Sequence, residues 1–520
     1  MMSVIEVDER VSAPDDVPAD AAASRRAGRW ILAAMCAALV AVVASVSGLN
    51  VATEALANDL GASQSQLLWV INGYTIALAA LLLPIGAIGD RWGRKKVLIV
   101  GLVVFVAANL AAAFATSMNM LLVTRVIGGV AAAMIMPVTL SVITSTFAAE
   151  ERDRAVGVWA GFAGAGGILG LFASAFVIDH ASWPWVFALP TVLAVVALAM
   201  TVMVVPHSRE DHTGRFDTVG AVLSVLAIGG LVMGIQEGPE RGWFAPLTAF
   251  GLVIGGVCLA AFIVYELRHR HPLLAVRVFR NRLVSAGSIT LVVLFAVMMG
   301  IFLTLVQFLQ SVAGFSALGA AAGLLPMAML MMPLSSIAPL IARKVGFRAM
   351  FVIGSVFTAL GLALIAIMAS ATGGYLSILP GLLVVSVGVG LLMTPSTTAI
   401  TSGLPLEEQG VASALNDTVR EFGGALGIAL LGSLVSSGYR SGVAGILGQM
   451  PPQAAEAVNQ GIGGASIVAR HAGPQGEALM TVARGAFVDG WTTAMWVSAG
   501  LMVVCGLVLA TLTPKRTRND

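Results

Sequence analysis

Long runs of apolar residues, separated by short polar turns, repeat along almost the whole chain. A helix that crosses a lipid bilayer needs roughly 20 mostly apolar residues. Runs of that length predict membrane-spanning helices near 30–52, 66–88, 97–116, 120–146, 155–178, 185–205, 217–236, 247–267, 283–310, 317–341, 349–369, 376–401, 410–436 and 491–512. The pattern therefore predicts an all-α integral membrane protein with fourteen transmembrane helices.

The composition agrees with a membrane protein and excludes an ordinary soluble domain. Hydrophobic residues make up 58% of the 520 residues and charged residues only 11%, whereas soluble domains carry about 25% charged residues. The three cysteines, Cys36, Cys258 and Cys505, lie inside apolar runs, so we expect neither a disulfide framework nor a metal site. No phosphate-binding glycine loop or nucleophile motif occurs, so we expect no cofactor, no enzyme activity and no ATP-driven pump on this chain.

The distribution of positive charge predicts the topology. Most of the 29 Lys and Arg residues fall in segments that lie on one side of the membrane if the N-terminus is cytoplasmic. Lys and Arg concentrate in the cytoplasmic loops of membrane proteins. We therefore predict a multi-pass protein of the cell membrane with both termini in the cytoplasm. A long extracellular loop is expected at 437–490, and its sequence leaves open whether it shapes an outer vestibule or serves as a linker.

The turn after the second predicted helix carries the most ordered motif in the chain. It reads Gly86-Ala87-Ile88-Gly89-Asp90-Arg91-Trp92-Gly93-Arg94-Lys95-Lys96. Its glycines let helices approach closely. The string resembles the loop between helices 2 and 3 of the major facilitator superfamily of transporters. The resemblance implies a gating loop formed by Gly86, Gly89, Asp90, Arg91, Gly93, Arg94 and Lys95. The alternative is a basic turn that only sets the topology.

Asp90 is expected to contact another helix at the cytoplasmic end. The thirteenth predicted helix begins near Gly410 on the same side of the membrane. A helix N-terminus favours a nearby carboxylate, because the unpaired N–H groups carry partial positive charge. We therefore expect Asp90 to meet the start of that helix, and the resemblance implies that this contact holds the outward-open state.

A second turn suggests an internal repeat. Residues 339–348 keep the glycine and the cations of the 86–95 turn but lack its acid. Such a repeat is typical of transporters built from two six-helix halves. The expected domains are a disordered cytoplasmic tail (1–29), an N-terminal six-helix bundle (30–205), an inserted helix pair (217–267), a C-terminal six-helix bundle (283–512) and a cytoplasmic tail (513–520).

Further motifs narrow the resemblance to the fourteen-helix drug:proton antiporter family of the EmrB/QacA type. They are Arg215-Phe216-Asp217, Glu237-Gly238-Pro239-Glu240-Arg241-Gly242-Trp243, His271-Pro272-Leu273-Leu274 and Phe279-Arg280-Asn281-Arg282. The resemblance implies a major facilitator fold and a secondary active transporter that exports lipophilic small molecules in exchange for protons. A dedicated exporter of one metabolite, antibiotic or lipid is the alternative. A membrane receptor or enzyme would need a sensor or catalytic motif that the sequence lacks.

The same resemblance implies the partners of the chain. They are lipophilic small-molecule substrates, protons and membrane lipid, without nucleic acid, and we expect a monomer.

Two helices of the N-terminal half carry family motifs. Arg125 lies in an apolar run, and an arginine inside a membrane normally faces the protein interior or a water-filled cavity. The resemblance implies a part in proton coupling, while a structural hydrogen-bond anchor is the alternative. The fifth helix is rich in glycine, and four positions form a helix-packing antiporter motif: Gly161, Gly166, Gly167 and Gly170. Gly167 stands where the family usually has Pro.

The first two helices depart from the family. Relatives often carry an acid where this chain has Ser45, and some carry one where it has Asn72. A new acid, Glu54, lies near the outer end of the first helix. These departures put strongly dicationic substrates in doubt. We expect the substrate cavity to include Asn50, Trp69, Asn72, Tyr74 and Asn416.

The thirteenth helix holds three ionisable residues in one span: Asp417, Arg420 and Glu421. Each would cost roughly 2.5–3.5 kcal/mol at a lipid-facing midplane, so they should face a cavity or one another. Asp417 and Glu421 are four residues apart and share a helix face. Two carboxylates beside one cation cannot both ionise at low cost. We therefore predict that this helix carries the proton, with a purely structural ion network as the alternative.

Overall fold

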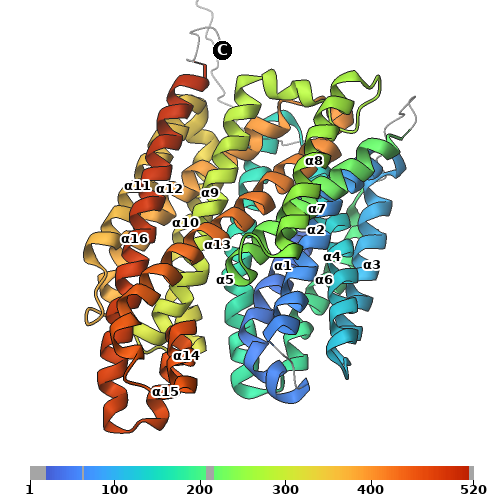
Figure 1. Ribbon diagram of the computed structural model, residues 1–520. Helices are drawn as coiled ribbons and strands as arrows, with labels where there is room; N and C mark the ends of the chain where they lie inside the picture. The colour runs from blue at the N-terminus through green and yellow to red at the C-terminus, as the bar shows by residue number, and fades with distance from the viewer. Residues whose placement is uncertain (1–18, 61–63, 207–215, 515–520) are drawn as a thin grey trace, which may run out of the picture.

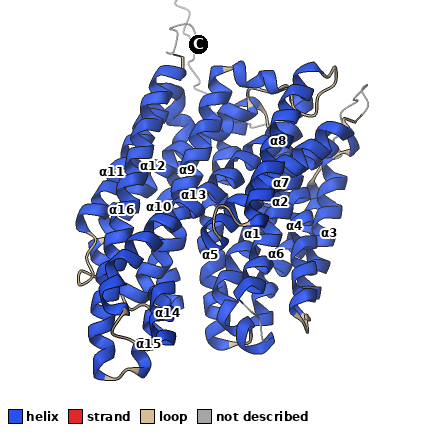
Figure 2. Cartoon of the chain, in the orientation of Figure 1, coloured by secondary structure: helices blue, strands red, loops and turns tan. Residues whose placement is uncertain are grey.

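The computed structural model describes residues 19–60, 64–206 and 216–514, and these ranges fold into helices joined by short turns (Figure 1; Figure 2). Fourteen helices in the described chain are long and apolar enough to cross a membrane, which confirms the number predicted from the apolar runs. Lipid offers the backbone no hydrogen-bond partners. The α-helix satisfies its own N–H and C=O groups, so apolar runs of this length adopt it.

The helices have the following bounds. The first six are α1 (Ala19–Leu60), α2 (Gln64–Trp92), α3 (Arg94–Ala113), α4 (Met118–Thr146), α5 (Ala149–His180) and α6 (Ala188–Val204). The next four are α7 (Thr218–Arg241), α8 (Pro246–Arg268), α9 (Arg282–Gln307) and α10 (Ala317–Val345). The last six are α11 (Phe347–Met368), α12 (Leu379–Thr401), α13 (Gln409–Leu447), α14 (Pro452–Gln460), α15 (Ile462–His471) and α16 (Pro474–Leu512).

Two large hydrophobic cores lie in the two halves of the chain. One is built mainly by α1 to α6, with Trp159 of α5 among its fully buried side chains. The other is built mainly by α9 to α16 and contains Phe351 and Trp491. α5 also contributes Ala165 and Ile168 to the second core. This helix therefore packs between the two halves.

The inserted pair, α7 and α8, lies on the side of the molecule where α2 and α13 meet. A small hydrophobic cluster joins Ala79 of α2, Val232 of α7 and Ala425 of α13. In addition, Gln236 of α7 donates a hydrogen bond to Thr75 of α2 at 3.2 Å. The insertion thus contacts both halves.

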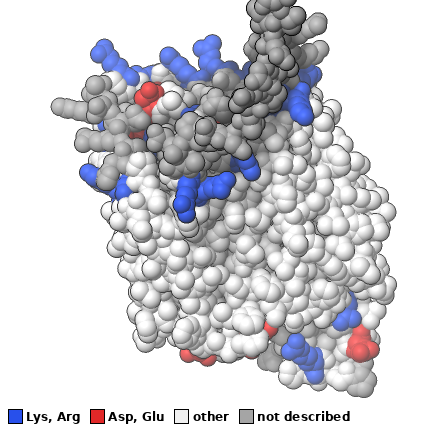
Figure 3. All heavy atoms as spheres, turned by 180° about the vertical axis from the view of Figure 1, so that it is seen from behind, with Lys and Arg blue, Asp and Glu red and all other residues white. Residues whose placement is uncertain are grey.

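Positive charge gathers at one end of the molecule, at the top of Figure 3. We call this end the basic end. In the described chain it includes Arg91, Lys96, Arg343 and Lys344, at the ends of α2 and α10 and the start of α3. The C-terminal end of α16 lies at this end, and α14 and α15 lie at the opposite end (Figure 1).

Two domain predictions are wrong in part. α1 begins at Ala19, so residues 19–29 are helical rather than disordered, as alanine-rich sequence favours. The predicted loop at 437–490 is mostly helical, because α13 continues to Leu447, α14 and α15 follow, and α16 begins at Pro474. Val458 and Ile462 of this segment pack on the C-terminal core. Residues 1–18, 207–215 (with Arg215 of the predicted motif) and 515–520 lie outside the described residues.

Candidate functional site

Asp90 joins the end of α2 to the start of α13 at the basic end. Its carboxylate accepts hydrogen bonds from the backbone N–H groups of Gly410 (2.9 Å) and Val411 (3.1 Å). Arg94 donates to the same carboxylate at 3.0 Å, and both charged side chains are buried. The contact that the sequence predicts is therefore present, and the gating role stays a prediction.

Glycine allows α2 and α13 to approach at this point. A Cβ on Gly86 would lie 2.5 Å from the carbonyl oxygen of Gly410, well inside van der Waals contact. Gly93, between α2 and α3, has a φ of 101°, a conformation that favours glycine. Gly89 faces Val138 of α4 at an ordinary contact distance.

The cations of the same turn reach three different neighbours. The guanidinium of Arg91 lies 5.7 Å from the centre of the Phe216 ring, just before α7. Lys95 donates to the carbonyl oxygen of Val202 in α6 at 2.9 Å. Arg94 also donates to the carbonyl oxygen of Leu406, close to α13, at 3.2 Å. The turn therefore connects α2 with the N-terminal half, the insertion and the C-terminal half.

α5 and α10 form a second contact between the halves towards the basic end. Arg343 pairs with Asp153 at 2.9 Å on the surface. Deeper in, the hydroxyl of Ser335 donates to the carbonyl oxygen of Gly157 at 3.3 Å. Gly161 follows one turn later, and a Cβ on it would lie 3.4 Å from the Cα and the carbonyl oxygen of Met332. Together with Asp90, these contacts hold the two halves together at the basic end.

The other glycines of the α5 motif face α1. A Cβ on Gly170 would lie 2.5 Å from the Cα of Ala44, so this position admits no larger residue without movement. Gly167 faces the hydroxyl of Ser47, and Gly166 faces Val40. Within the motif, Gly161 thus lies towards α10 and the other three lie towards α1.

Arg125 of α4 is buried among neutral groups. Its guanidinium donates to the hydroxyl of Ser45 at 2.9 Å and lies 4.2 Å from the centre of the Tyr74 ring. Ser45 in turn donates to the side-chain oxygen of Asn109 at 3.3 Å. No described acidic side chain forms an ion pair with Arg125. The arginine is therefore an uncompensated buried cation in this part of the structure.

Asp417 and Arg420 of α13 form a buried ion pair. Their closest atoms are 3.4 Å apart, and Asn416 also donates to Asp417 at 3.0 Å. The Arg420 guanidinium lies 4.5 Å from the centre of the Phe295 ring in α9 and 5.4 Å from that of Trp159 in α5. Arg420 therefore contacts an aromatic ring in each half of the chain.

Glu421 is placed differently from the prediction. It is half-buried and forms no ion pair or hydrogen bond with the described residues, so it does not share Arg420 with Asp417 in direct contact. It is nevertheless close enough to interact electrostatically with Arg420, Asp417 and Tyr74. Glu421 is thus electrostatically coupled to the ion pair of α13 and to Tyr74.

The residues predicted to line a substrate cavity fall into two groups. Tyr74 and Asn416 are fully buried and belong to the Arg125 and Asp417 clusters. Trp69 and Asn72 of α2 are partly exposed. The Asn50 side chain, like that of Glu54, is outside the described part of α1. Tyr74 and Asn416 therefore pack against the buried charged residues Arg125 and Asp417 and do not line an open cavity.

Three acids near the ends of α7 and α8, where a helix end taken from the sequence would lie open to water, are buried. Asp217, Glu237 and Glu266 are each less than 5% exposed. Glu237 pairs with Arg241 one turn later on α7. Helix ends taken from the sequence do not reveal which neighbouring segment covers them. The motif Arg215-Phe216-Asp217 was the available signal. It does not reveal which residue packs against Asp217.

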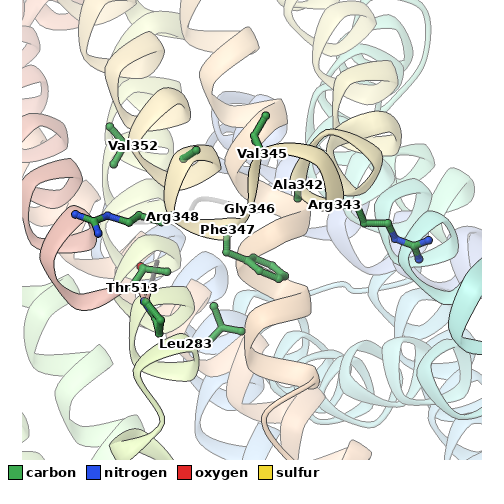
Figure 4. Close-up of a pocket in the computed structure, with 11 residues that line it drawn as sticks. Leu283, Ala342, Arg343, Val345, Gly346, Phe347, Arg348, Val352 and Thr513 are labelled. Carbon is green, nitrogen blue, oxygen red and sulfur yellow. The ribbon is translucent and has the colours of Figure 1, made fainter. Parts of the chain in front are cut away.

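A cavity of about 810 Å³ opens at the basic end of the C-terminal half (Figure 4). It is lined by the α10–α11 turn, with Phe347 turned towards it, and by Leu283 and Thr513. Its lining contains none of the predicted cavity residues. We therefore do not assign the substrate to it.

Comparison with known proteins agrees with these features. A family model described as Major Facilitator Superfamily matches residues 33–428. Methyl viologen resistance protein SmvA of Salmonella typhimurium is 31% identical over 89% of this chain and 93% of its own. Multidrug efflux pump LfrA of Mycolicibacterium smegmatis is 31% identical over 92% and 95%. Cephamycin export protein CmcT of Amycolatopsis lactamdurans is 32% identical over 78% and 84%.

Solved structures share the fold at low sequence identity. The human organic anion transporter MFSD10 (TETRAN) superimposes with a TM-score of 0.61 at 14% identity, over 94% of this chain and 99% of that chain. The proton:xylose symporter XylE gives a TM-score of 0.62 at 12% identity, over 94% and 97%. The fourteen membrane-spanning helices, the matched family model and these relatives lead to one assignment: the chain belongs to the Major Facilitator Superfamily.

Proposed function

We propose that this protein exports lipophilic small molecules across the cell membrane in exchange for protons, by alternating access. One relative is named for multidrug efflux, which supports a range of substrates, and another is named for resistance to methyl viologen. A third is named for export of one antibiotic class, cephamycin. A dedicated exporter is therefore the second candidate, and competition between unrelated compounds for transport distinguishes the two.

The ion pair of Asp417 and Arg420 is the observation that supports proton coupling. An ionised Asp417 attracts Arg420 strongly in this buried setting, whereas a protonated Asp417 does so only weakly. Arg420 also contacts Trp159 of α5 and Phe295 of α9. A proton on Asp417 would therefore change the balance of contacts that Arg420 makes with the two halves. Such a balance can link proton binding to the relative position of the halves.

Proton movement in proteoliposomes tests this role. In Asp417→Asn, substrate-driven proton movement, read with a pH-sensitive dye, should be lost while substrate binding remains. Glu477→Gln is the control, because Glu477 is an exposed acid on α16. If the double variant Asp417→Asn, Glu421→Gln moves protons as the wild type does, the coupling site lies elsewhere.

The Asp90 contact is proposed as the gate that closes the basic end. Hydrogen bonds to a charged group contribute about 1.5–3 kcal/mol, and Asp90→Asn weakens two of them at the N-terminus of α13. The substitution should destabilise the outward-open state relative to the inward-open state. Turnover should fall roughly tenfold for each 1.4 kcal/mol that this adds to the barrier between them, and substrate binding should be retained. Asp153→Asn is the matched control, since it removes an exposed contact between the halves at the same end. Equal turnover of Asp90→Asn and wild type would exclude the gate.

We propose that the basic end faces the cytoplasm and that both termini are cytoplasmic. Gln460 and Lys96 are both exposed, Lys96 at the basic end of the molecule and Gln460 at the opposite end. In a Cys258→Ala background, Gln460→Cys should react with an impermeant thiol reagent added to intact cells, and Lys96→Cys should not. Labelling of both from outside would contradict this topology.

A further inference from the structure

A second pair of buried carboxyl groups lies where α7 and α8 meet near the basic end. Asp217 is the N-cap residue of α7, and Glu266 lies in the last turn of α8. Their side chains are only 4% and 3% exposed. A Cβ on Gly220 would collide with Oδ2 of Asp217 and with Oε1 of Glu266. The two carboxyl groups therefore converge over Gly220, at a position where only glycine leaves them room.

The two carboxyl groups have unequal surroundings. Asp217 accepts hydrogen bonds from the N–H of Gly220 (2.8 Å), the hydroxyl of Tyr265 (3.2 Å) and the N–H of Leu273 (3.3 Å). Neither carboxyl oxygen of Glu266 makes a hydrogen bond of ordinary geometry with the described residues, and its nearest polar groups are the N–H groups of Leu273 and Leu274 and the carboxyl group of Asp217. Three well-placed donors favour negative charge on Asp217. Glu266, without such hydrogen bonds, is then the natural carrier of a proton.

The charged neighbours do not compensate a second negative charge. Tyr265 of α8 shares the site with the two acids, and the exposed His269 stacks on its ring with the ring centres 4.9 Å apart. Arg268 and Arg277 are exposed, and Arg277 donates to the carbonyl oxygen of Leu267 at 3.4 Å. From α2, Arg91 lies over the ring of Phe216. No ion pair with Asp217 or Glu266 occurs in the described part of the chain.

We propose that Asp217 and Glu266 form a second proton-binding site, separate from α13, in which one proton is held between the two carboxyl groups. Two buried carboxylates in contact cannot both ionise at low cost. The ligand is a proton rather than a metal ion, because backbone N–H groups already point at the oxygens of Asp217 and would repel a cation. The site rests on this geometry and not on the proposed transport function.

The site also has a consequence for the basic end. Leu273, which donates to Asp217, and Leu274 pack in a cluster with Ala87 of α2 and Val411 of α13. Val411 is one of the two residues that Asp90 binds. Loss of the proton would place two negative charges together and loosen the segment that carries Leu273. The proton thus stabilises the packing beside the Asp90 contact.

Infrared spectroscopy of the purified full-length protein tests the site. A protonated carboxyl group has a carbonyl stretching band that a carboxylate lacks. At neutral pH, Glu266→Gln should lose the intensity of one protonated carboxyl group relative to wild type. Asp217→Asn should lose it as well, because an amide in place of the charge lets Glu266 ionise. The exposed acid control, Glu477→Gln, should lose none at neutral pH. Unchanged spectra in both Glu266→Gln and Asp217→Asn would overturn the proposal.

A second measurement separates a proton site from a purely structural contact. Ala275 is half-buried directly after Leu274. In a Cys258→Ala background, labelling of Ala275→Cys should accelerate with rising pH by more than the ionisation of the thiol itself explains. With Glu266→Gln added, that extra acceleration should vanish while the slow rate at acidic pH is kept. A pH profile that is the same with and without Glu266→Gln would show that no proton on this pair holds the segment.

Discussion

Arg125 of α4 and Arg420 of α13 are both buried, at 3% and 5% exposure, but they have opposite kinds of neighbours. Arg420 pairs with a carboxylate, Asp417, at 3.4 Å. Arg125 donates to a hydroxyl, that of Ser45, at 2.9 Å. Each also contacts aromatic rings, which attract a cation by about 0.5–2 kcal/mol. The two clusters therefore differ chiefly in whether a titratable acid touches the arginine.

This difference separates two roles that the sequence alone left together. A hydroxyl does not change charge in the physiological pH range, so the direct contacts of Arg125 stay the same when protons bind. A carboxylate does change charge, so the contacts of Arg420 respond to a proton. We therefore propose that α13 carries the direct proton response and that Arg125 supplies a fixed positive charge. Glu421, the electrostatic neighbour of Tyr74, connects the two clusters.

The largest effect is expected for Arg420→Ala. The substitution leaves Asp417 buried without its cation, and breaking a buried ion pair in this way costs about 3–5 kcal/mol. Thermal unfolding of the purified protein in detergent measures the loss. Adding Asp417→Asn to Arg420→Ala should restore much of the stability, because the uncompensated charge is then gone. A double variant as unstable as Arg420→Ala would mean that packing, not charge, dominates at this site.

A smaller loss is expected for Arg125→Ala. The substitution removes one hydrogen bond and a ring contact but leaves neutral groups behind, so the expected cost is about 1–3 kcal/mol in the same unfolding assay. The pH dependence of transport should keep its midpoint, since none of the acids that the structure describes contacts Arg125 directly. A shifted midpoint in Arg125→Ala, as large as that in Asp417→Asn, would remove the distinction between the clusters.

The smallest effect, a gain, is expected for Ser45→Asp. It gives Arg125 the carboxylate partner that Arg420 already has. Arg125 is buried in the wild type and in the variant alike, so its own desolvation cost does not change. The expected gain is about 1 kcal/mol or less at neutral pH, because burying the new carboxylate offsets part of the attraction. The gain should disappear at acidic pH, where the new carboxyl takes up a proton. Ser45→Asn is the uncharged control, and an equal gain in both variants would argue against pairing.

Much of the fold follows from the sequence. Apolar runs of sufficient length become helices in lipid whatever their neighbours, because the backbone must satisfy its own hydrogen bonds. The Asp90 contact was also predictable, since the acid ends one helix and a second helix begins on the same side. The segment 437–490 was predicted as a loop and not as helix. Its helices α14 and α15 are short, and packing on the C-terminal core, rather than an apolar run, stabilises them.

For the charged residues of the candidate site, too, part follows from the sequence and part from the tertiary structure. The sequence by itself determined which charged residues enter the membrane, because an Arg or Asp within an apolar run is plain to read. Only the tertiary structure decided their partners: Ser45 beside Arg125, Trp159 beside Arg420, and Asp217 against Glu266. The first two pairs join helices far apart in the chain, and the third joins the consecutive helices α7 and α8. Their contacts depend on how each helix is rotated and how closely glycine lets it approach, which are properties of packing and not of any one segment.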